Sequence, residues 1–287
     1  MSLTLHERRI RMISMRALRL VDNVAYHGKD FFGRESHLIL KPRPRNSWTW
    51  VDYNMEPVRI SPEILKSNKR RVQLVFGNKI LNVFEHIGVL RHVGLVGVEV
   101  CGVGWPPYDG SAHELWNLVE PCIKETTEQL RLYTVEKSVR FQSPILRRGR
   151  KVFTEIHPSL DGRTTLDIFV DFKGLGEHRE VFSLPNRELF KEICSARSLG
   201  FPSWLYYPTK MASLVGYPHF KNVCWSKSSS KEETLREIVR HRALDILGAM
   251  SVLSEEGLFV GNIVSSCSGH AEDVGAIDLA IPLVHLL

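Results

Sequence analysis

The sequence lacks the features that mark disulfide-rich, membrane-spanning and repeat proteins. Its five cysteines are odd in number and widely spaced, and no two of them form a Cys-x-x-Cys pair. A disulfide framework is therefore not expected, and the cysteines fit a reducing cytoplasm. No apolar run approaches the roughly 18 residues that a membrane-spanning helix needs. The arginines at positions 8–19 faintly resemble an organelle transit peptide, but we interpret this segment as a basic first helix or strand.

Positive charge is present without being concentrated. The 287 residues carry a formal net charge of +6, and the densest basic clusters, at 8–19, 66–71 and 147–151, are short. This balance weakly favours anionic ligands. Because no nucleic-acid-binding motif accompanies this charge, we expect a small-molecule substrate rather than nucleic acid. We also expect the protein to be a monomer.

Strand and helix patterns alternate in two comparable halves. Strands are predicted at 17–26, 36–42, 72–76, 96–100, 133–141, 151–156, 164–172 and 261–266. Helices are predicted at 80–90 with Asn82 as N-cap, 111–120, 121–130, 186–195, 231–253 capped by Ser229 or Ser230, and 273–287. Asp161-Gly162 predicts a hairpin turn. The pattern favours an α+β fold of two domains, residues 1–128 and 129–287, each a β-sheet layered on α-helices.

The predicted helix at 231–253 carries the first candidate metal ligands. His241 and Asp245 lie four residues apart, so both side chains leave the same helical face. Imidazole nitrogens and carboxylate oxygens both bind zinc, and three protein ligands with one open position are typical of catalytic zinc. Taken alone, such a pair is more often an exposed hydrogen-bonded pair or a core histidine.

Two further histidines extend this hypothesis. His86 follows Glu85 directly, and a carboxylate beside a metal ligand can take a proton from the attacking water. His270 follows a predicted strand in the sequence Ser-Gly-His, a position suited to a general acid or an oxyanion partner. In isolation each histidine is better explained as an ordinary polar residue, so the hypothesis depends on their combination.

The order and spacing of these motifs resemble one enzyme family. The chain carries Phe-Glu-His-Ile at 84–87, Pro-Tyr-Asp-Gly-Ser at 107–111, His-Arg-x-x-Asp-x-x-Gly at 241–248 and Gly-His at 269–270. The UDP-3-O-acyl-N-acetylglucosamine deacetylases of lipid A biosynthesis have V-E-H-L, P-I-x-D-G-S, H-K-x-x-D-x-I-G-D and G-H in the same order. The resemblance covers nearly the whole chain, up to His270.

The resemblance implies zinc-dependent hydrolysis of an N-acetyl amide on an amino sugar, at a site between the two domains. The positions that match the family's zinc ligands are His86, His241 and Asp245. Glu85 falls on the general base, and His270 falls on the group that protonates the leaving amine or stabilises the tetrahedral intermediate. Ser198 falls on a threonine whose hydroxyl helps hold the oxyanion. The expected substrate is a UDP-linked, acylated N-acetylglucosamine or a related molecule.

Two departures from the family pattern bear on activity. Arg242 replaces the family's lysine, and a planar guanidinium is not equivalent to a point charge near a transition state. Ala249 replaces an aspartate that supports the catalytic histidine in the family, and Glu272 or Asp273 could substitute only if their loop folds back. A second hypothesis therefore stays open. The chain could keep zinc and the fold but bind a sugar nucleotide or a protein, or act on a different N-acyl substrate.

The family's acyl chain lies in an apolar passage, and the corresponding stretch here includes residues 135–153. The aromatic segment Leu199–Pro208 could pack a lipid, stack a sugar or form core.

Overall fold

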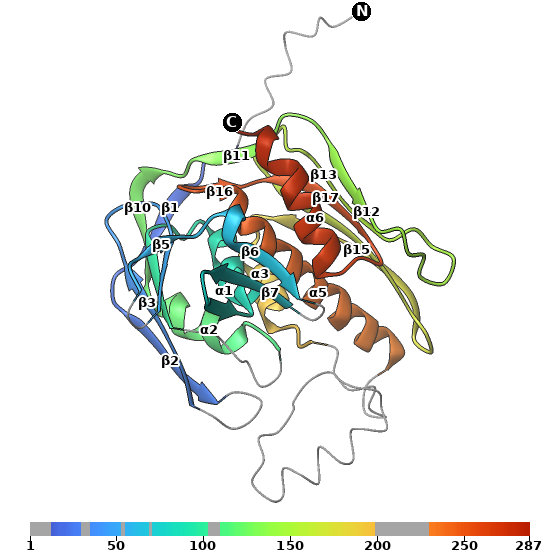
Figure 1. The fold of residues 1–287 in the computed structure, drawn as a ribbon, viewed down its shortest axis with the longest axis horizontal. Helices are drawn as coiled ribbons and strands as arrows, with labels where there is room; N and C mark the ends of the chain where they lie inside the picture. The colour runs from blue at the N-terminus through green and yellow to red at the C-terminus, as the bar shows by residue number, and fades with distance from the viewer. Residues whose placement is uncertain (1–12, 30–34, 53–54, 69–70, 103–109, 199–229) are drawn as a thin grey trace, which may run out of the picture.

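A computed structural model describes residues 13–29, 35–52, 55–68, 71–102, 110–198 and 230–287. The α+β class predicted from the sequence is confirmed, because helices and several β-sheets share the molecule. Helices α1, α3, α5 and α6 occupy its middle, with strands on both sides (Figure 1). Within these ranges, no helix is both long and apolar enough to cross a membrane. The aromatic segment at 199–208, the Pro-Tyr-Asp part of the 107–111 motif and the first arginines lie outside the described residues.

The first half of the chain forms one five-stranded and one three-stranded sheet. The five-stranded sheet has the order β2 (Val24–Lys29), β3 (Glu35–Pro42), β9 (Val98–Gly102), β4 (Thr49–Val51) and β5 (Val58–Arg59). The three-stranded sheet consists of β6 (Leu65–Asn68), β7 (Arg71–Phe76) and β8 (Lys79–Asn82). Val72 and Leu74 of β7 are buried, and so are Val98, Val100 and Gly102 of β9, as expected for strands with one face on a core.

The second half contains a five-stranded sheet whose central strand is the one that comes last in the sequence. Its order is β12 (Val139–Gln142), β13 (Phe153–Pro158), β17 (Gly261–Ser266), β14 (Thr164–Phe172) and β15 (Gly176–Leu184). β17 runs antiparallel to β13 and parallel to β14. Two small sheets complete the fold: β1 (Arg16–Leu20) with β10 (Ile123–Gln129), and β16 (Leu258–Phe259), β11 (Leu132–Val135) and β18 (Val284–Leu286).

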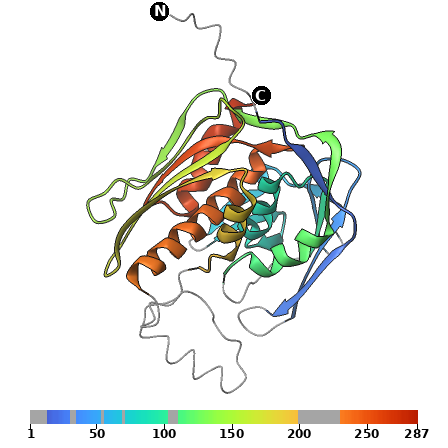
Figure 2. The ribbon, with the colours of Figure 1, turned by 180° about the vertical axis from the view of Figure 1, so that it is seen from behind.

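The helices are α1 (Phe84–Gly88), α2 (His113–Val119), α3 (Arg187–Ser195), α5 (Lys231–Met250) and α6 (His270–Ala280). Ser230 caps α5 as predicted, in a capping box with Glu233. The Asn186 side chain caps α3 by accepting from the Leu189 amide. α5 packs on β14 and β15, and α6 packs on β12 and β13. Seen from behind, α3 lies beside α5 (Figure 2).

Two predicted elements are wrong because tertiary pairing overrides local pattern. The stretch 121–130 contains strand β10 (Ile123–Gln129) rather than a polar helix, since its β-branched residues pair antiparallel with β1. Asp161-Gly162 forms a turn, in which Gly162 has φ +79° and Asp161 Oδ1 accepts from the Arg163 amide at 3.0 Å. It is not a hairpin, because β17 lies between the two strands that the turn connects.

Two predicted helix boundaries also need correction. Asn82 is the last residue of β8, paired with Gln73, and is not an N-cap. Helix α1 begins at Phe84, after Val83 adopts the left-handed conformation with φ 56°. The last helix begins at His270 rather than at Asp273 and ends at Ala280. Beyond it, Pro282 lies in a 3₁₀ turn (Ile281–Leu283) before β18 pairs with β11.

Buried apolar residues of both halves belong to one continuous cluster. Leu90 from the first half and Leu247 from the second are members, and neither side chain is exposed. The division into domains at 128/129 stays a prediction.

Candidate metal centre

Two helices from different halves of the chain cross in close contact. A Cβ atom added to Gly248 on α5 would lie 1.9 Å from the Glu85 carbonyl oxygen on α1. A Cβ atom on Gly88 would lie 2.5 Å from the Gly248 carbonyl oxygen. Only glycine fits at both positions, so the two backbones approach more closely than any side chain would allow. The crossing brings Glu85 and His86 to the side of α5 that carries His241 and Asp245.

The three predicted metal ligands lie together. His86, His241 and Asp245 each offer one ligand atom, and these atoms are all within 4.8 Å of one another. His241 Nε2 is 3.5 Å from Asp245 Oδ1, and the His86 and His241 ring centres are 5.8 Å apart, edge to face. His86 and Asp245 are buried, with 4% and 6% exposure. Two residues on one helix and one on another thus form a compact set of three ligand atoms.

The protonation and hydrogen bonding of these side chains are compatible with binding a metal ion. His241 Nδ1 lies 3.2 Å from the Ala196 carbonyl oxygen, which can only accept, so Nδ1 carries the proton and Nε2 keeps its lone pair. His86 Nδ1 and Asp245 Oδ1 are buried and have no hydrogen-bond partner in the described part of the chain. Buried polar atoms are rarely left unpaired, and a cation among them would satisfy both.

The electrostatic environment favours the protonation states that ligands need. Burial, with a smaller contribution from His241, lowers the pKa of His86 to about 3, so its imidazole is neutral. Burial alone would raise the pKa of Asp245, but the nearby His241, His270 and Arg242 hold it below its ordinary value. A neutral histidine and an ionised carboxylate are the forms that bind metal.

Glu85 and His270 flank the same carboxylate. Ligand atoms of Glu85, Asp245 and His270 also lie within 4.8 Å of one another. Glu85 is buried, and its Oε2 accepts a hydrogen bond of 3.0 Å from the Val72 amide. Burial, followed by the charge of Asp245, raises the pKa of Glu85 well above its ordinary value. His270 is half-buried at the first residue of α6, and its Nδ1 has no partner among the described residues.

Arg242 lies next to these groups, and the carboxylate of Asp273 holds its guanidinium in place. It forms a buried ion pair with Asp273, which also accepts a hydrogen bond of 2.9 Å from Thr154. Arg242 Nη2 further donates to Ser268 Oγ at 3.0 Å, and Nη1 lies 3.8 Å from Asp245 Oδ2. Asp273 thus contacts Arg242 rather than His270.

Glu272 does not replace the carboxylate missing at Ala249 either. Its Oε2 accepts from the Gly269 amide at 2.8 Å and caps α6.

The segment that carries Ser198 contacts the metal-ligand helix. Arg197, one residue before it, binds Glu237 of α5, with Nε–Oε1 at 2.7 Å. Ser198 packs so closely on Gly110 that a Cβ atom there would lie 2.1 Å from Ser198 Oγ. The structure therefore joins the end of the 107–111 motif to the Ser198 segment.

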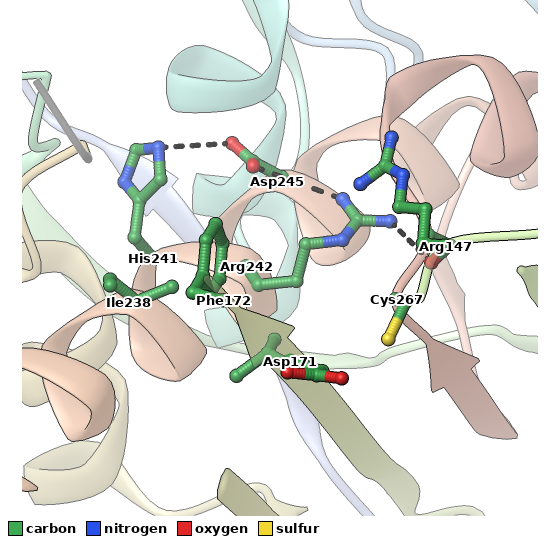
Figure 3. Close-up of a pocket in the computed structure, with 10 residues that line it drawn as sticks. Arg147, Asp171, Phe172, Ile238, His241, Arg242, Asp245 and Cys267 are labelled. Carbon is green, nitrogen blue, oxygen red and sulfur yellow. Dashed lines mark hydrogen bonds and ion pairs between the residues drawn. The ribbon is translucent and has the colours of Figure 1, made fainter. Parts of the chain in front are cut away.

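A cavity of about 140 Å³ adjoins the ligands (Figure 3). His241, Arg242 and Asp245 line one side of it. Arg147, Asp171 and Phe172 line another. No motif predicted Asp171 or Phe172, because β14 brings them here through sheet pairing with β17, which the sequence does not reveal.

Comparisons with known proteins identify the family of the chain. The sequence model of the UDP-3-O-acyl N-acetylglycosamine deacetylase family matches residues 20–278. The chain is similar to the UDP-3-O-acyl-N-acetylglucosamine deacetylase of Nautilia profundicola, with 27% identity over 222 residues, covering 74% of this chain and 73% of that protein. It is also similar to the protein of the same name from Syntrophus aciditrophicus, with 29% identity over 195 residues, covering 67% of this chain and 58% of that protein.

Proposed function

The chain belongs to the UDP-3-O-acyl N-acetylglycosamine deacetylase family, and we propose that it is a zinc-dependent enzyme that removes the N-acetyl group from a UDP-linked, acylated amino sugar. The cluster of His86, His241 and Asp245 supports this proposal best, because His86 Nδ1 and Asp245 Oδ1 are buried there without a hydrogen bond from any described residue. Zinc, the UDP-sugar and a place in lipid A biosynthesis are parts of the proposal.

We assign roles to the surrounding residues from the family motifs that they match. When bound by the three ligands, zinc would supply a Lewis acid that polarises the amide carbonyl and lowers the pKa of water. Glu85 takes a proton from the attacking water at Oε1, because Oε2 is occupied by the Val72 amide. His270 delivers a proton to the leaving amine nitrogen. Ser198 Oγ donates to the carbonyl oxygen as negative charge develops there.

Arg242 acts next to Asp245 in this proposal. Its guanidinium stabilises the negative charge of the transition state, and Asp273 and Ser268 keep it in one orientation. The reaction yields acetate and the free amine.

Metal analysis and acetate release together test the proposal. Purified protein should carry about one zinc and release acetate from UDP-3-O-acyl-N-acetylglucosamine. Glu85→Gln should keep the zinc and lower kcat by about 100-fold or more. His241→Ala should lose both zinc and activity, whereas His157→Ala, a histidine outside the cluster, should lose neither. Protein that binds no zinc even when zinc is supplied would contradict the proposal.

The second hypothesis, a binding protein without deacetylase activity, rests on His270. Its Nδ1 has no hydrogen-bond partner in the described ranges, and Ala249 offers no carboxylate. Introducing Ala249→Asp separates the two functions. A large rise in acetate release would support a weakened deacetylase. Zinc binding without turnover in both proteins would favour a binding role or a different N-acyl substrate.

A cytoplasmic location, a monomeric state and the absence of nucleic-acid binding belong to the same proposal. Light scattering and a salt-dependent binding assay test the last two.

A further inference from the structure

The β12–β13 hairpin lies at the edge of the molecule (Figure 1), and two aliphatic residues in it are exposed. Ile145 and Leu146 are 68% and 57% exposed. The hairpin ends in a tight turn, in which the Arg147 and Arg150 amides each donate to the other's carbonyl at 3.0 and 2.9 Å. Arg148 and Gly149 have φ 52° and 78°, as in a type I′ turn. The aliphatic pair therefore lies directly before a regular β-turn rather than in an irregular loop.

Ion pairs fix this hairpin to the neighbouring β14–β15 turn. Arg148 and Arg150 both pair with Asp171, and Arg150 also pairs with Glu177. The Arg150 guanidinium lies 5.0 Å from the Phe169 ring centre as well. Asp171 and Glu177 are partners across β14 and β15. The tip of the hairpin and the β14–β15 turn thus form one surface.

This surface carries more positive than negative charge. Arg147, Lys151 and Lys173 add three cations, and the side chain of none of them forms an ion pair with another described residue. Asp171 and Glu177 are already engaged by Arg148 and Arg150. Aliphatic side chains surrounded by unneutralised cations match the interface of an anionic bilayer, where the chains enter the headgroup region and the cations meet lipid phosphates.

We propose that Ile145, Leu146, Lys151 and Lys173 form a docking surface for an anionic lipid bilayer. Docking would hold the neighbouring cavity near the membrane surface, because Arg147 of the hairpin and Asp171 of β14 both line that cavity. Peripheral binding of this kind needs no membrane-spanning helix. The inference goes beyond the deacetylase proposal, because it concerns where the protein binds and not which bond it cleaves.

Vesicle co-sedimentation of the zinc-loaded full chain tests the docking surface without any activity measurement. One vesicle preparation contains phosphatidylcholine alone and the other an equimolar mixture with phosphatidylglycerol. We expect binding to the mixed vesicles only, weakened by added salt. Ile145→Ser and Leu146→Ser should each lower the partition coefficient about tenfold. Lys151→Gln and Lys173→Gln should each lower it about fivefold.

Leu160→Ser provides the matched control. Leu160 is 69% exposed in the turn at the other end of β13, so the same loss of an exposed aliphatic chain there should leave vesicle binding unchanged. Thermal melting checks that every variant is folded. Equal binding to both vesicle types, no binding to either, or unchanged binding by the Ile145→Ser/Leu146→Ser double variant would overturn the proposal. A dimer in sedimentation velocity that this double variant abolishes would also overturn it, since the pair would then serve a second copy.

Discussion

At the scale of single residues, Arg242 and Asp273 form an ion pair in which both side chains are buried. Asp273→Asn removes the nearer of the two carboxylates beside the buried Arg242 guanidinium and leaves only Asp245 at 3.8 Å, and we expect the free energy of unfolding to fall by about 3 kcal/mol. Urea unfolding measures this change. Asp167→Asn is the control, because its partner Arg179 has a side chain 65% exposed and the loss there should stay below about 1 kcal/mol. Equal losses in both variants would refute a special role for the buried pair.

His92 predicts a pH dependence of stability that arises away from the candidate ligands. Burial lowers its pKa from 6.5 to about 4 in the folded protein, although its Nε2 bonds to the Leu247 carbonyl oxygen. The unfolded chain therefore binds the proton more tightly. The stability that neutral His92 contributes is present above pH 6.5 and is lost as the pH falls toward 4. The full loss is on the order of 3 kcal/mol.

The His92→Gln variant isolates this contribution. We expect its free energy of unfolding to depend less steeply on pH between 6.5 and about 4 than that of the unaltered protein. Both proteins are compared in chelator, so that proton competition for zinc is absent. Parallel pH profiles would show that His92 is not protonated on unfolding in this range.

At the scale of elements, the crossing of α1 and α5 decides whether the ligands meet. Gly248→Ala places a methyl group against the Glu85 backbone, so the helices must separate. We expect a loss of about 3 kcal/mol in stability and a clear fall in zinc affinity, measured by calorimetry. Gly77→Ala is the control. Gly77 has φ +58°, so an alanine there can lower stability, but its Cβ would meet nothing within 4 Å and zinc affinity should not change.

Elements that depend on residues close together in sequence were predictable, whereas elements that depend on pairing with distant segments were not. α5 was predictable with its cap, because Ser230, Glu233 and the helical spacing of its residues are local signals. The spacing of His241 and Asp245 on that helix was predictable for the same reason. β10 was not, since its seven polar and β-branched residues become a strand only by pairing with β1. The left-handed conformation of Val83 before α1 was not predictable either, because a β-branched residue rarely adopts that conformation.

The residues of the candidate site were predictable from the sequence, but the contacts between them were not. Motif order selected Glu85, His86 and His270, and the structure places all three beside Asp245. The sequence left open whether Glu272 or Asp273 would support His270, and the structure instead has Glu272 capping α6 and Asp273 paired with Arg242. These residues are adjacent in sequence, and only the start of α6 at His270 decides which of them faces α5.

At the scale of the whole molecule, the three proposed metal ligands come from both halves of the chain. Because His86 comes from α1 and the other two ligands come from α5, zinc should bind the folded state and scarcely the unfolded one. Zinc at about 100 times its dissociation constant should add about 2.7 kcal/mol to stability. A chelator should therefore lower the Tm by several degrees, and re-added zinc should restore it. In His86→Ala the Tm should no longer respond to either.

The central position of β17 has a consequence for how the chain is made. On the ribosome, β13 and β14 emerge about 100 residues before Gly261–Ser266, the strand that must lie between them. Until then both nascent strands expose unpaired edges, which are prone to mispair with each other or with another chain. A premature stop before Gly261 would release a polypeptide whose second sheet cannot close. Synthesis past Ser266 is thus the step that commits the second half of this protein to its fold.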